Sequence, residues 1–507
     1  MTAKKQMTPE EREAEQLIQQ DMDDLHREEK FNDFLDCIMD TPDDLQQFKI
    51  LKGLSGIIDL DDNEVFYHTV FAHKQGHYTP VVVTSQGKLY PVHNNALLLI
   101  SQSQNLENPD YKNDDGEPLF NKINDVPPEE RYQFFEIEST RYKFIQPIFW
   151  NDDYSIQLID NAAIHDVINK KQYSRQVYDD SRNLIQEYFY HPNIYEYDAL
   201  NAANIISYIE NILGNVFYLV LFGGMGTGKS VAICLLSFLQ HHGYFVGKGT
   251  IPSRCRLLHF YGISLNQDEF EKMRADEKTM LVNVFNTGFN SYGRYTLTNM
   301  GIKDIKRQTI SLKTFGMKSF TCNELKGFDA SFIDRLYIIL SVKTNKKLKN
   351  IYRLSTEELK RFQDIRNKLF VYCLFNWKEI LDDINIMRGT LESKDIFGRE
   401  TDKNSIILGI IKHFCGDNYA AKVQAYIAEK APVSQLEHIK TIEYVILEKI
   451  VNKIDPTKPT AFIDVTNDEL YQQLLKELDY EQGDQYAPTN TKPRKILDSL
   501  GLTTPSI

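Results

Sequence analysis

Residues 215–239 read NVFYLVLFGGMGTGKSVAICLLSFL, and this stretch decides the fold that we expect. Residues 215–222 form a nearly unbroken apolar run, as a strand buried on both faces requires. The apolar segment after Ser230 predicts a helix. Between them, Gly223–Ser230 matches the pattern G-x-x-x-x-G-K-S/T, whose glycines let the backbone turn tightly and approach a phosphate. The sequence therefore predicts an α/β fold with a phosphate-binding loop between a buried strand and a helix.

The loop predicts a site for ATP with Mg²⁺. Backbone N–H groups of the loop and of the helix N-terminus supply positive potential for a polyphosphate. We expect Lys229 to reach the β- and γ-phosphates and the Ser230 hydroxyl to bind Mg²⁺. The expected nucleotide-binding residues are Gly223, Gly224, Met225, Gly226, Thr227, Gly228, Lys229 and Ser230.

A second acidic source for the metal and for water is expected at GISLNQDEF, residues 262–270. A short strand, Ile263–Gln267, would place Asp268 and Glu269 at its carboxyl end, beside the loop. Asp268 would hold Mg²⁺, and Glu269 would orient or deprotonate the attacking water.

Two other interpretations of this region remain open. Asp268 and Glu269 could instead open an acidic helix, since the strand before them ends in two polar residues, Asn266 and Gln267. The pair Asp276–Glu277 is a weaker candidate for the catalytic carboxylates because no strand pattern precedes it.

Length and composition limit the number of domains and the class of protein that we expect. A length of 507 residues predicts two to four domains. No apolar run approaches the roughly 20 residues that a membrane-spanning helix needs, and Met1–Glu15 is too polar for a signal peptide. The six cysteines are scattered, which argues against a disulfide framework or a zinc site and favours a reducing cytoplasm.

Charge is distributed unevenly along the chain, whose net charge is -13. Residues 1–45 carry 14 Asp/Glu and 5 Lys/Arg, whereas residues 301–353 carry 12 Lys/Arg and 4 Asp/Glu. The expected domains are an acidic helical arm (1–50), a β-rich N-terminal domain (51–160), a P-loop ATPase domain (161–345), a helical lid (346–430) and a winged-helix-like C-terminal module (431–507).

Beyond the loop, the chain resembles the P-loop ATPases of plasmid and phage replication proteins, in the broad AAA+ and superfamily III helicase class. The resemblance covers roughly residues 190–420 and rests on the order of LVNVFNTGFNSYGRYTLTN, ISLKTFGMKSFTCNE, ASFIDRLYIIL and FGRETDKNSIILGIIKHF. Asn286 and Gly288 match the Asn-x-Gly that ends a helix in that group. The polar strand before Asp268 departs from the pattern, and the lid has no clear second-sensor arginine.

The resemblance implies two further catalytic residues. Asn323, after a strand expected at Lys318–Cys322, would sense the γ-phosphate. Arg335, before a strand expected at Leu336–Leu340, would reach the nucleotide of a neighbouring subunit, which implies a ring, most simply a homo-hexamer. A salt bridge from Arg335 to Asp334 or Asp329 is the structural alternative.

DNA is the expected partner. In the group that the chain resembles, a loop before the sensor strand projects into the ring channel, where Lys303, Lys306 and Arg307 would follow a single-stranded phosphate backbone. An exposed turn with solvated lysines is equally compatible with this segment. Three short C-terminal helices could form a winged helix with Lys492, Arg494 and Lys495 on phosphates, or a plain packing module.

The sequence thus predicts an ATP-hydrolysing DNA motor, such as the replicative helicase of a plasmid or virus. An oligomeric ATP-dependent switch without unwinding activity is one alternative, and a P-loop kinase is another. Activation of ATP hydrolysis by DNA would distinguish the motor from the switch.

Overall fold

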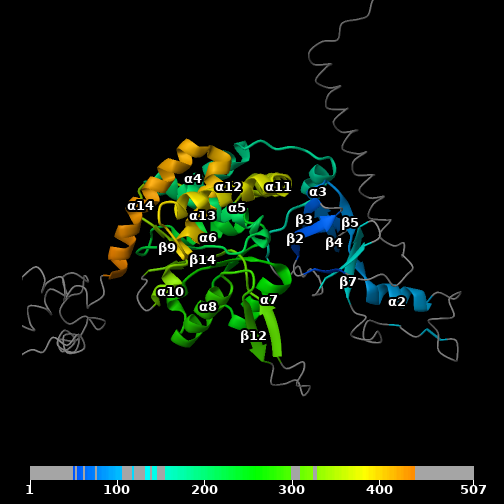
Figure 1. Ribbon diagram of the computed structural model, residues 1–507. Helices are drawn as coiled ribbons and strands as arrows, with labels where there is room; N and C mark the ends of the chain where they lie inside the picture. The colour runs from blue at the N-terminus through cyan, green and yellow to red at the C-terminus, as the bar shows by residue number, and fades with distance from the viewer. Residues whose placement is uncertain are drawn as a thin grey trace, which may run out of the picture. The chain divides into compact units, whose positions relative to one another are not determined.

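The computed structural model describes residues 49–51, 54–60, 63–74, 77–104, 117–118, 121, 132–137, 140–144, 155–298, 309–323 and 328–439 (Figure 1). The chain divides into two compact units, residues 1–324 with 328–420, and residues 325–327 with 421–507. All elements below belong to the first unit, except the later part of the last helix. The expected acidic arm, up to residue 48, and all but the start of the expected C-terminal module lie outside the described residues.

Two four-stranded sheets form the N-terminal part of the first unit. The first sheet is antiparallel, in the order β2 (Ser55–Leu60), β3 (Asn63–Lys74), β4 (His77–Thr84) and β5 (Leu89–Pro91). The second has the order β1 (Lys49–Leu51), β8 (Thr140–Phe144), β7 (Gln133–Ile137) and β6 (His93–Asn94), and helix α2 (Asn95–Gln104) follows it in the chain.

Strand β3 is buried on both of its faces because its side chains alternate between two cores. Tyr67 belongs to a cluster with Phe135 and Tyr142 of the second sheet. On the opposite face, Phe66 lies 5.9 Å from the ring of Trp377, and His68 donates or accepts a 2.9 Å hydrogen bond with the carbonyl of Tyr208. Strand β3 therefore joins the N-terminal sheets to the helices that flank the central sheet.

Three helices precede the central sheet, namely α3 (Asn161–Ile168), α4 (Gln176–Tyr188) and α5 (Ile194–Ile206), followed by a 3-10 turn, η5 (Glu210–Ile212). Asp160 caps α3 by accepting from the backbone N–H groups of Ala162 and Ala163, and Asn193 caps α5 through the N–H of Tyr195. These side chains satisfy donors that a helix start leaves unpaired.

The central sheet has five parallel strands. Their spatial order is β10 (Gly243–Val246), β11 (Ser264–Gln267), β14 (Lys318–Cys322), β9 (Tyr218–Phe222) and β15 (Leu336–Leu340). The helices of this region are α6 (Lys229–Leu239), α7 (Ile251–Tyr261), α8 (Ala275–Thr287) and α10 (Ala330–Ile333), with a 3-10 turn, η6 (Phe270–Lys272). The mixed α/β class expected from the sequence is confirmed, and all five strands end at one edge of the sheet.

An antiparallel hairpin joins α8 to β14. Its strands are β12 (Arg294–Thr298) and β13 (Thr309–Lys313), and Figure 1 shows the hairpin projecting below α7, beside α8. The residues that connect the two strands, 299–308, lie outside the described part of the chain.

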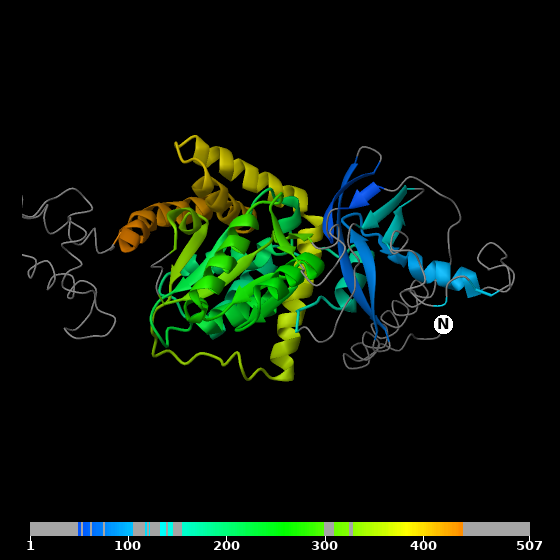
Figure 2. The same ribbon diagram turned by 90° about the horizontal axis from the view of Figure 1, so that it is seen from below.

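The helices that follow the sheet are α11 (Thr356–Phe375), α12 (Trp377–Glu392), α13 (Arg399–Cys415) and α14 (Asp417–Ile439), coloured yellow to orange in Figure 2. Ser355 and Glu358 form a capping box at the start of α11. Helices α12 and α13 approach closely at Gly409, where a Cβ atom would lie 2.4 Å from the Cα of Ile384. Among the described helices, none is both long and apolar enough to cross a membrane.

Candidate nucleotide-binding site

The loop between β9 and α6 has a backbone that requires glycine. Gly223, Gly226 and Gly228 have φ angles of 145°, 75° and 85°, which other residues adopt only with strain. A Cβ atom on Gly223 would also lie 2.6 Å from the carbonyl oxygen of Ser341. At three positions of the sequence pattern, the backbone conformation therefore requires glycine.

Lys229 places a buried ammonium group inside the loop. Lys229 is the first residue of α6, and only 8% of it is exposed. Its Nζ donates to the carbonyl oxygens of Gly223 at 2.5 Å and Gly224 at 2.7 Å. Phosphate oxygens make shorter and stronger charge-assisted hydrogen bonds than neutral carbonyls do. The loop thus holds a cation ready to exchange carbonyl partners for an anion.

Asp268 lies directly after β11 and faces the start of α6. Its Oδ1 accepts from the Ser230 hydroxyl at 2.9 Å, from the Thr321 hydroxyl at 2.7 Å and from the N–H of Glu269 at 3.0 Å. Thr321 comes from β14, so one carboxylate joins three neighbouring elements. Hydroxyl and carboxylate oxygens are ligands that Mg²⁺ prefers, and the adjacent oxygens of Ser230 and Asp268 fit such an ion.

Glu269 lies beside this cluster but has an ion-pair partner of its own. Its backbone is in the left-handed region at φ 52°, and its carboxylate pairs with the ammonium of Lys272, while 44% of its side chain is exposed. A general base must be released from such a pair before it can accept a proton from water. Lys272 was not singled out from the sequence, although its i+3 position is the usual spacing for such a pair.

The acidic-helix interpretation does not describe this region of the structure. Helix α8 begins only at Ala275, and its N-cap residue, Arg274, makes no side-chain capping bond. Asp276 and Glu277 lie in the first turn of α8 and both pair with the exposed Arg274. Neither of these two carboxylates follows a strand of the central sheet.

The polar strand β11 is explained by buried amide hydrogen bonds. Asn266 Nδ2 donates to Gln240 Oε1 at 2.7 Å, and Gln267 Nε2 donates to the carbonyl of Gly247 at 2.9 Å. These bonds tie the strand to the end of α6 and to the residue after β10, which compensates for burying two amides. The corresponding amide oxygens, Asn266 Oδ1 and Gln267 Oε1, are buried without a partner among the described residues.

Asn323 and Arg335 lie at opposite edges of the sheet. Asn323 directly follows β14 and is exposed at the edge that carries the loop and Asp268. Arg335 precedes β15, and its carbonyl accepts from the N–H of Tyr218 at the start of β9. Arg335 is therefore separated from the loop of its own subunit by the length of the strands.

The guanidinium group of Arg335 has unusual surroundings. It lies 5.3 Å from the ring centroid of Phe289 and donates to the carbonyl of Ser331, which also accepts from Arg399 at 3.0 Å. Arg399 pairs with Asp334 at 3.6 Å, whereas Arg335 itself forms no ion pair with a described residue. Burial and then the charge of Arg399 lower the pKa of Arg335. The expected salt bridge to Asp334 is thus made by another arginine.

The candidate DNA contacts all lie outside the described residues. They are Lys303, Lys306 and Arg307 in the hairpin connection, and Lys492, Arg494 and Lys495 near the C-terminus. The paired strands β12 and β13 show where the basic connection begins and where it ends.

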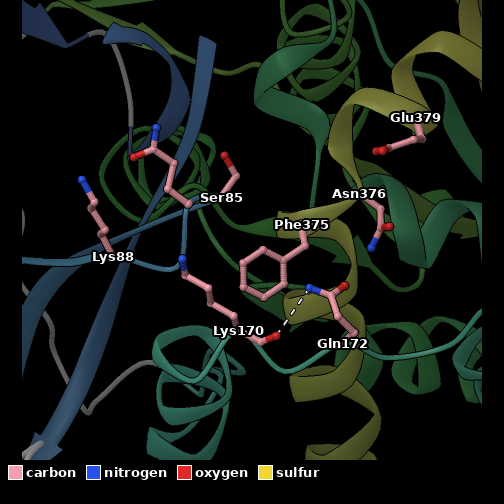
Figure 3. Close-up of a pocket in the computed structure, with 8 residues that line it drawn as sticks. Ser85, Lys88, Lys170, Gln172, Phe375, Asn376 and Glu379 are labelled. Carbon is pink, nitrogen blue, oxygen red and sulfur yellow. Dashed lines mark hydrogen bonds between the residues drawn. The ribbon is translucent and has the colours of Figure 1, made fainter. Parts of the chain in front are cut away.

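A cavity of about 640 Å³ lies away from the phosphate loop. Figure 3 shows it between the turn before β5, the segment after α3 and the junction of α11 and α12. Its lining carries both charges, with Lys88 and Lys170 on one side and Glu379 on the other, and Gln172 donates a 3.5 Å hydrogen bond to the Lys170 carbonyl. None of the nucleotide-site residues expected from the sequence lines this cavity.

Comparison with known proteins finds only distant structural likeness. No protein-family model matches the chain, and no curated protein does. The structure titled "SCCmec type IV Cch - active helicase" is 11% identical, with 90% of this chain and 95% of that chain covered, at a TM-score of 0.33. The NrS-1 C-terminal region is 13% identical, with 69% and 87% covered, at a TM-score of 0.27. Scores this low carry no argument, so function must be inferred from the chain's own residues.

Proposed function

We propose that this chain is a P-loop ATPase of the AAA+ and superfamily III type that hydrolyses ATP and moves DNA. The observation that carries the proposal is the meeting of Lys229, Ser230 and Asp268 at one edge of a parallel sheet. The insertion of β14 between β9 and β11 supports it, since the strand ending in Asn323 then lies between the loop and the acidic residues.

The residues suggest how the reaction would proceed. The loop N–H groups and Lys229 would hold the β- and γ-phosphates, and Asp268 with Ser230 would hold Mg²⁺, which neutralises phosphate charge. Glu269, freed from Lys272, would accept a proton from the attacking water, and Asn323 would position the γ-phosphate. The water oxygen would form a bond to the γ-phosphorus while the bond from that phosphorus to the β–γ bridging oxygen breaks. ADP would keep the bridging oxygen, phosphate would be released, and Glu269 would take the water proton.

Oligomerisation is part of the proposal. Arg335 lies at the amino ends of the strands, so it would complete the nucleotide site of a neighbouring subunit rather than its own. A homo-oligomeric ring, with six subunits as the simplest case, would place the basic connection between β12 and β13 around single-stranded DNA. A role as the replicative helicase of a plasmid or virus fits such a ring.

A second candidate is an ATP-dependent oligomeric switch that does not unwind DNA. It is favoured by the ion pair between Glu269 and Lys272, which occupies the carboxylate expected to act as the general base. A P-loop kinase would differ from both, because it would release no phosphate without an added acceptor.

ATP hydrolysis with and without single-stranded DNA tests the proposal. We expect DNA to stimulate phosphate release by the wild-type chain, and Glu269→Gln to abolish hydrolysis while leaving Mg-ATP binding intact. Lys272→Ala is the matched control, because it frees Glu269 without removing it and should keep or raise the rate. Hydrolysis that ignores DNA would favour the switch, and normal hydrolysis by Glu269→Gln would refute the assignment of the base.

A further inference from the structure

The segment after β15, residues 341–353, runs alongside the phosphate loop; we call it the strap. At its start, the N–H of Ser341 donates to the carbonyl of Phe222 at 2.7 Å, next to the first loop residue. The Ser341 carbonyl occupies the space that a Cβ atom on Gly223 would need. The strap is thus in direct contact with the loop backbone.

The strap is anchored beyond this point as well. The N–H of Lys349 donates to the carbonyl of Glu187 at 2.9 Å, and its ammonium pairs with the Glu187 carboxylate at 2.8 Å. The ammonium of Lys346 lies 4.4 Å from the ring centroid of Tyr190. Since both ends of the strap are held, the position of the residues between them is restricted.

Lys343 projects from the strap toward the loop. Its Cε atom lies 4.0 Å from the place where a Cβ atom on Gly226 would be. The ammonium nitrogen is bonded to this Cε atom. Unlike Lys346 and Lys349, Lys343 has no hydrogen bond, ion pair or aromatic partner in the described part of the chain. An exposed, unpaired ammonium beside a loop of phosphate-binding geometry is available for an anion that enters the loop.

We propose that Lys343 is a second phosphate-binding lysine, which contacts the phosphates of the bound nucleotide from the strap while Lys229 contacts them from the loop. This inference rests on the proposed function, because it requires that the loop bind a nucleotide. The chemistry is simple charge complementarity: a polyphosphate carries more negative charge than one ammonium neutralises. No residue between β15 and α11 was singled out from the sequence, although the lysine-rich run KTNKKLK at residues 343–349 was a visible signal.

Calorimetry of Mg-ATP binding to the full chain tests this inference. Lys343→Ala should weaken binding by about tenfold, as expected for one partly solvated, charge-assisted contact, and Lys343→Arg should restore most of it. The matched control is Lys347→Ala, which removes the same charge from an exposed position in the same strap, where no described residue pairs with it. The loss should shrink at high salt and should be smaller for AMP than for ATP, since fewer phosphates remain to be contacted.

The outcomes separate this inference from the proposed function. If wild-type protein binds Mg-ATP and Lys343→Ala binds it as tightly as Lys347→Ala does, the strap lysine has no phosphate role and only this inference fails. If wild-type protein binds no Mg-ATP at all, the proposed function fails and this inference fails with it. The melting temperature of each variant, expected to match the wild type, excludes a loss of affinity through unfolding.

Discussion

The two edges of the five-stranded sheet use polar residues in different ways. At the carboxyl edge, Lys229 donates to carbonyl oxygens of the loop, and the Asp268 carboxylate accepts from the hydroxyls of Ser230 and Thr321. At the amino edge, titratable groups are buried and serve packing: burial raises the pKa of Glu210 and lowers that of Lys318.

The same edge carries two buried histidines before β10. Burial lowers the pKa of His242 to about 4 and that of His241 well below its ordinary value. Displaced pKa values are often taken to mark active sites. At this edge the displaced pKa values belong both to buried packing residues and to Arg335, to which we assign catalysis, so a displaced pKa alone does not identify a catalytic residue.

The largest expected effect comes from the one amino-edge residue to which we assign catalysis. Arg335→Ala should lower the maximal rate of ATP hydrolysis by about 10³-fold, the usual worth of an arginine supplied by a neighbour, and should leave Mg-ATP affinity almost unchanged. Mixing this variant with Lys229→Ala protein should restore part of the activity, because each subunit supplies what the other lacks. If Arg335→Ala hydrolyses saturating ATP at the wild-type rate, Arg335 has no catalytic role and the amino edge is purely structural.

At the carboxyl edge, Lys229→Ala should weaken Mg-ATP binding by about 100-fold, because a buried ammonium makes several charge-assisted hydrogen bonds. Equilibrium binding of a fluorescent ATP analogue measures this loss. Arg274→Ala, which removes an exposed cation from the same domain, is the control and should bind normally. Equal binding by both variants would contradict the assignment of the loop.

Glu210 tests whether the amino edge is structural. Its carboxylate accepts from the N–H of Met317 at 2.6 Å. Glu210→Ala leaves that donor buried and unpaired, and should cost about 1–3 kcal/mol of unfolding free energy. Glu210→Gln keeps an acceptor and should cost clearly less. Urea denaturation measures the unfolding free energy of both variants. Equal losses would show that the hydrogen bond to Met317 contributes little to stability.

The last expected effect is a pH dependence of stability. His68 and His242 have pKa values lowered by burial to about 3 and about 4, against 6.5 in an unfolded chain. Below pH 6.5 the unfolded chain binds protons that the folded chain does not, so their contribution to stability is complete above pH 6.5 and is lost as pH falls toward 4. Each group contributes up to about 1.4 kcal/mol per pH unit within this window.

Denaturation at pH 7 and pH 5 measures this dependence. His242→Gln removes one titrating group but keeps a donor for the carbonyl of Tyr261, which lies 2.8 Å from His242 Nδ1. The variant should therefore lose less stability between the two pH values than the wild type. An unchanged loss would mean that His242 already binds its proton in the folded chain at pH 5.

Sequence reasoning worked best where function depends on local backbone geometry. The loop glycines, the strands at Lys318–Cys322 and Leu336–Leu340, and the acidic pair after β11 follow from patterns within a few residues. The partners that come from distant segments could not be predicted, because no local pattern records them. Arg399 shares a carbonyl with Arg335 from 64 positions away in the chain, and Thr321 donates to Asp268 from the neighbouring strand.

The polar strand β11 shows the same limit of sequence reasoning, because distant partners explain residues that argued against a strand. Asn266 and Gln267 counted against a buried strand because burial of amides is costly without partners. Their partners, Gln240 and Gly247, belong to the end of α6 and the turn after β10, so only the folded chain shows how the cost is offset.

The joint between β13 and β14 has a mechanical consequence. Gly316 has φ 141°, a Cβ atom there would lie 2.9 Å from the Glu210 carboxylate, and the next N–H is bonded to that carboxylate. The connection between the hairpin and β14 is therefore held at Glu210. A displacement of β13 relative to β14 would have to break this contact, and the carboxyl end of β14 carries Thr321, whose hydroxyl donates to Asp268.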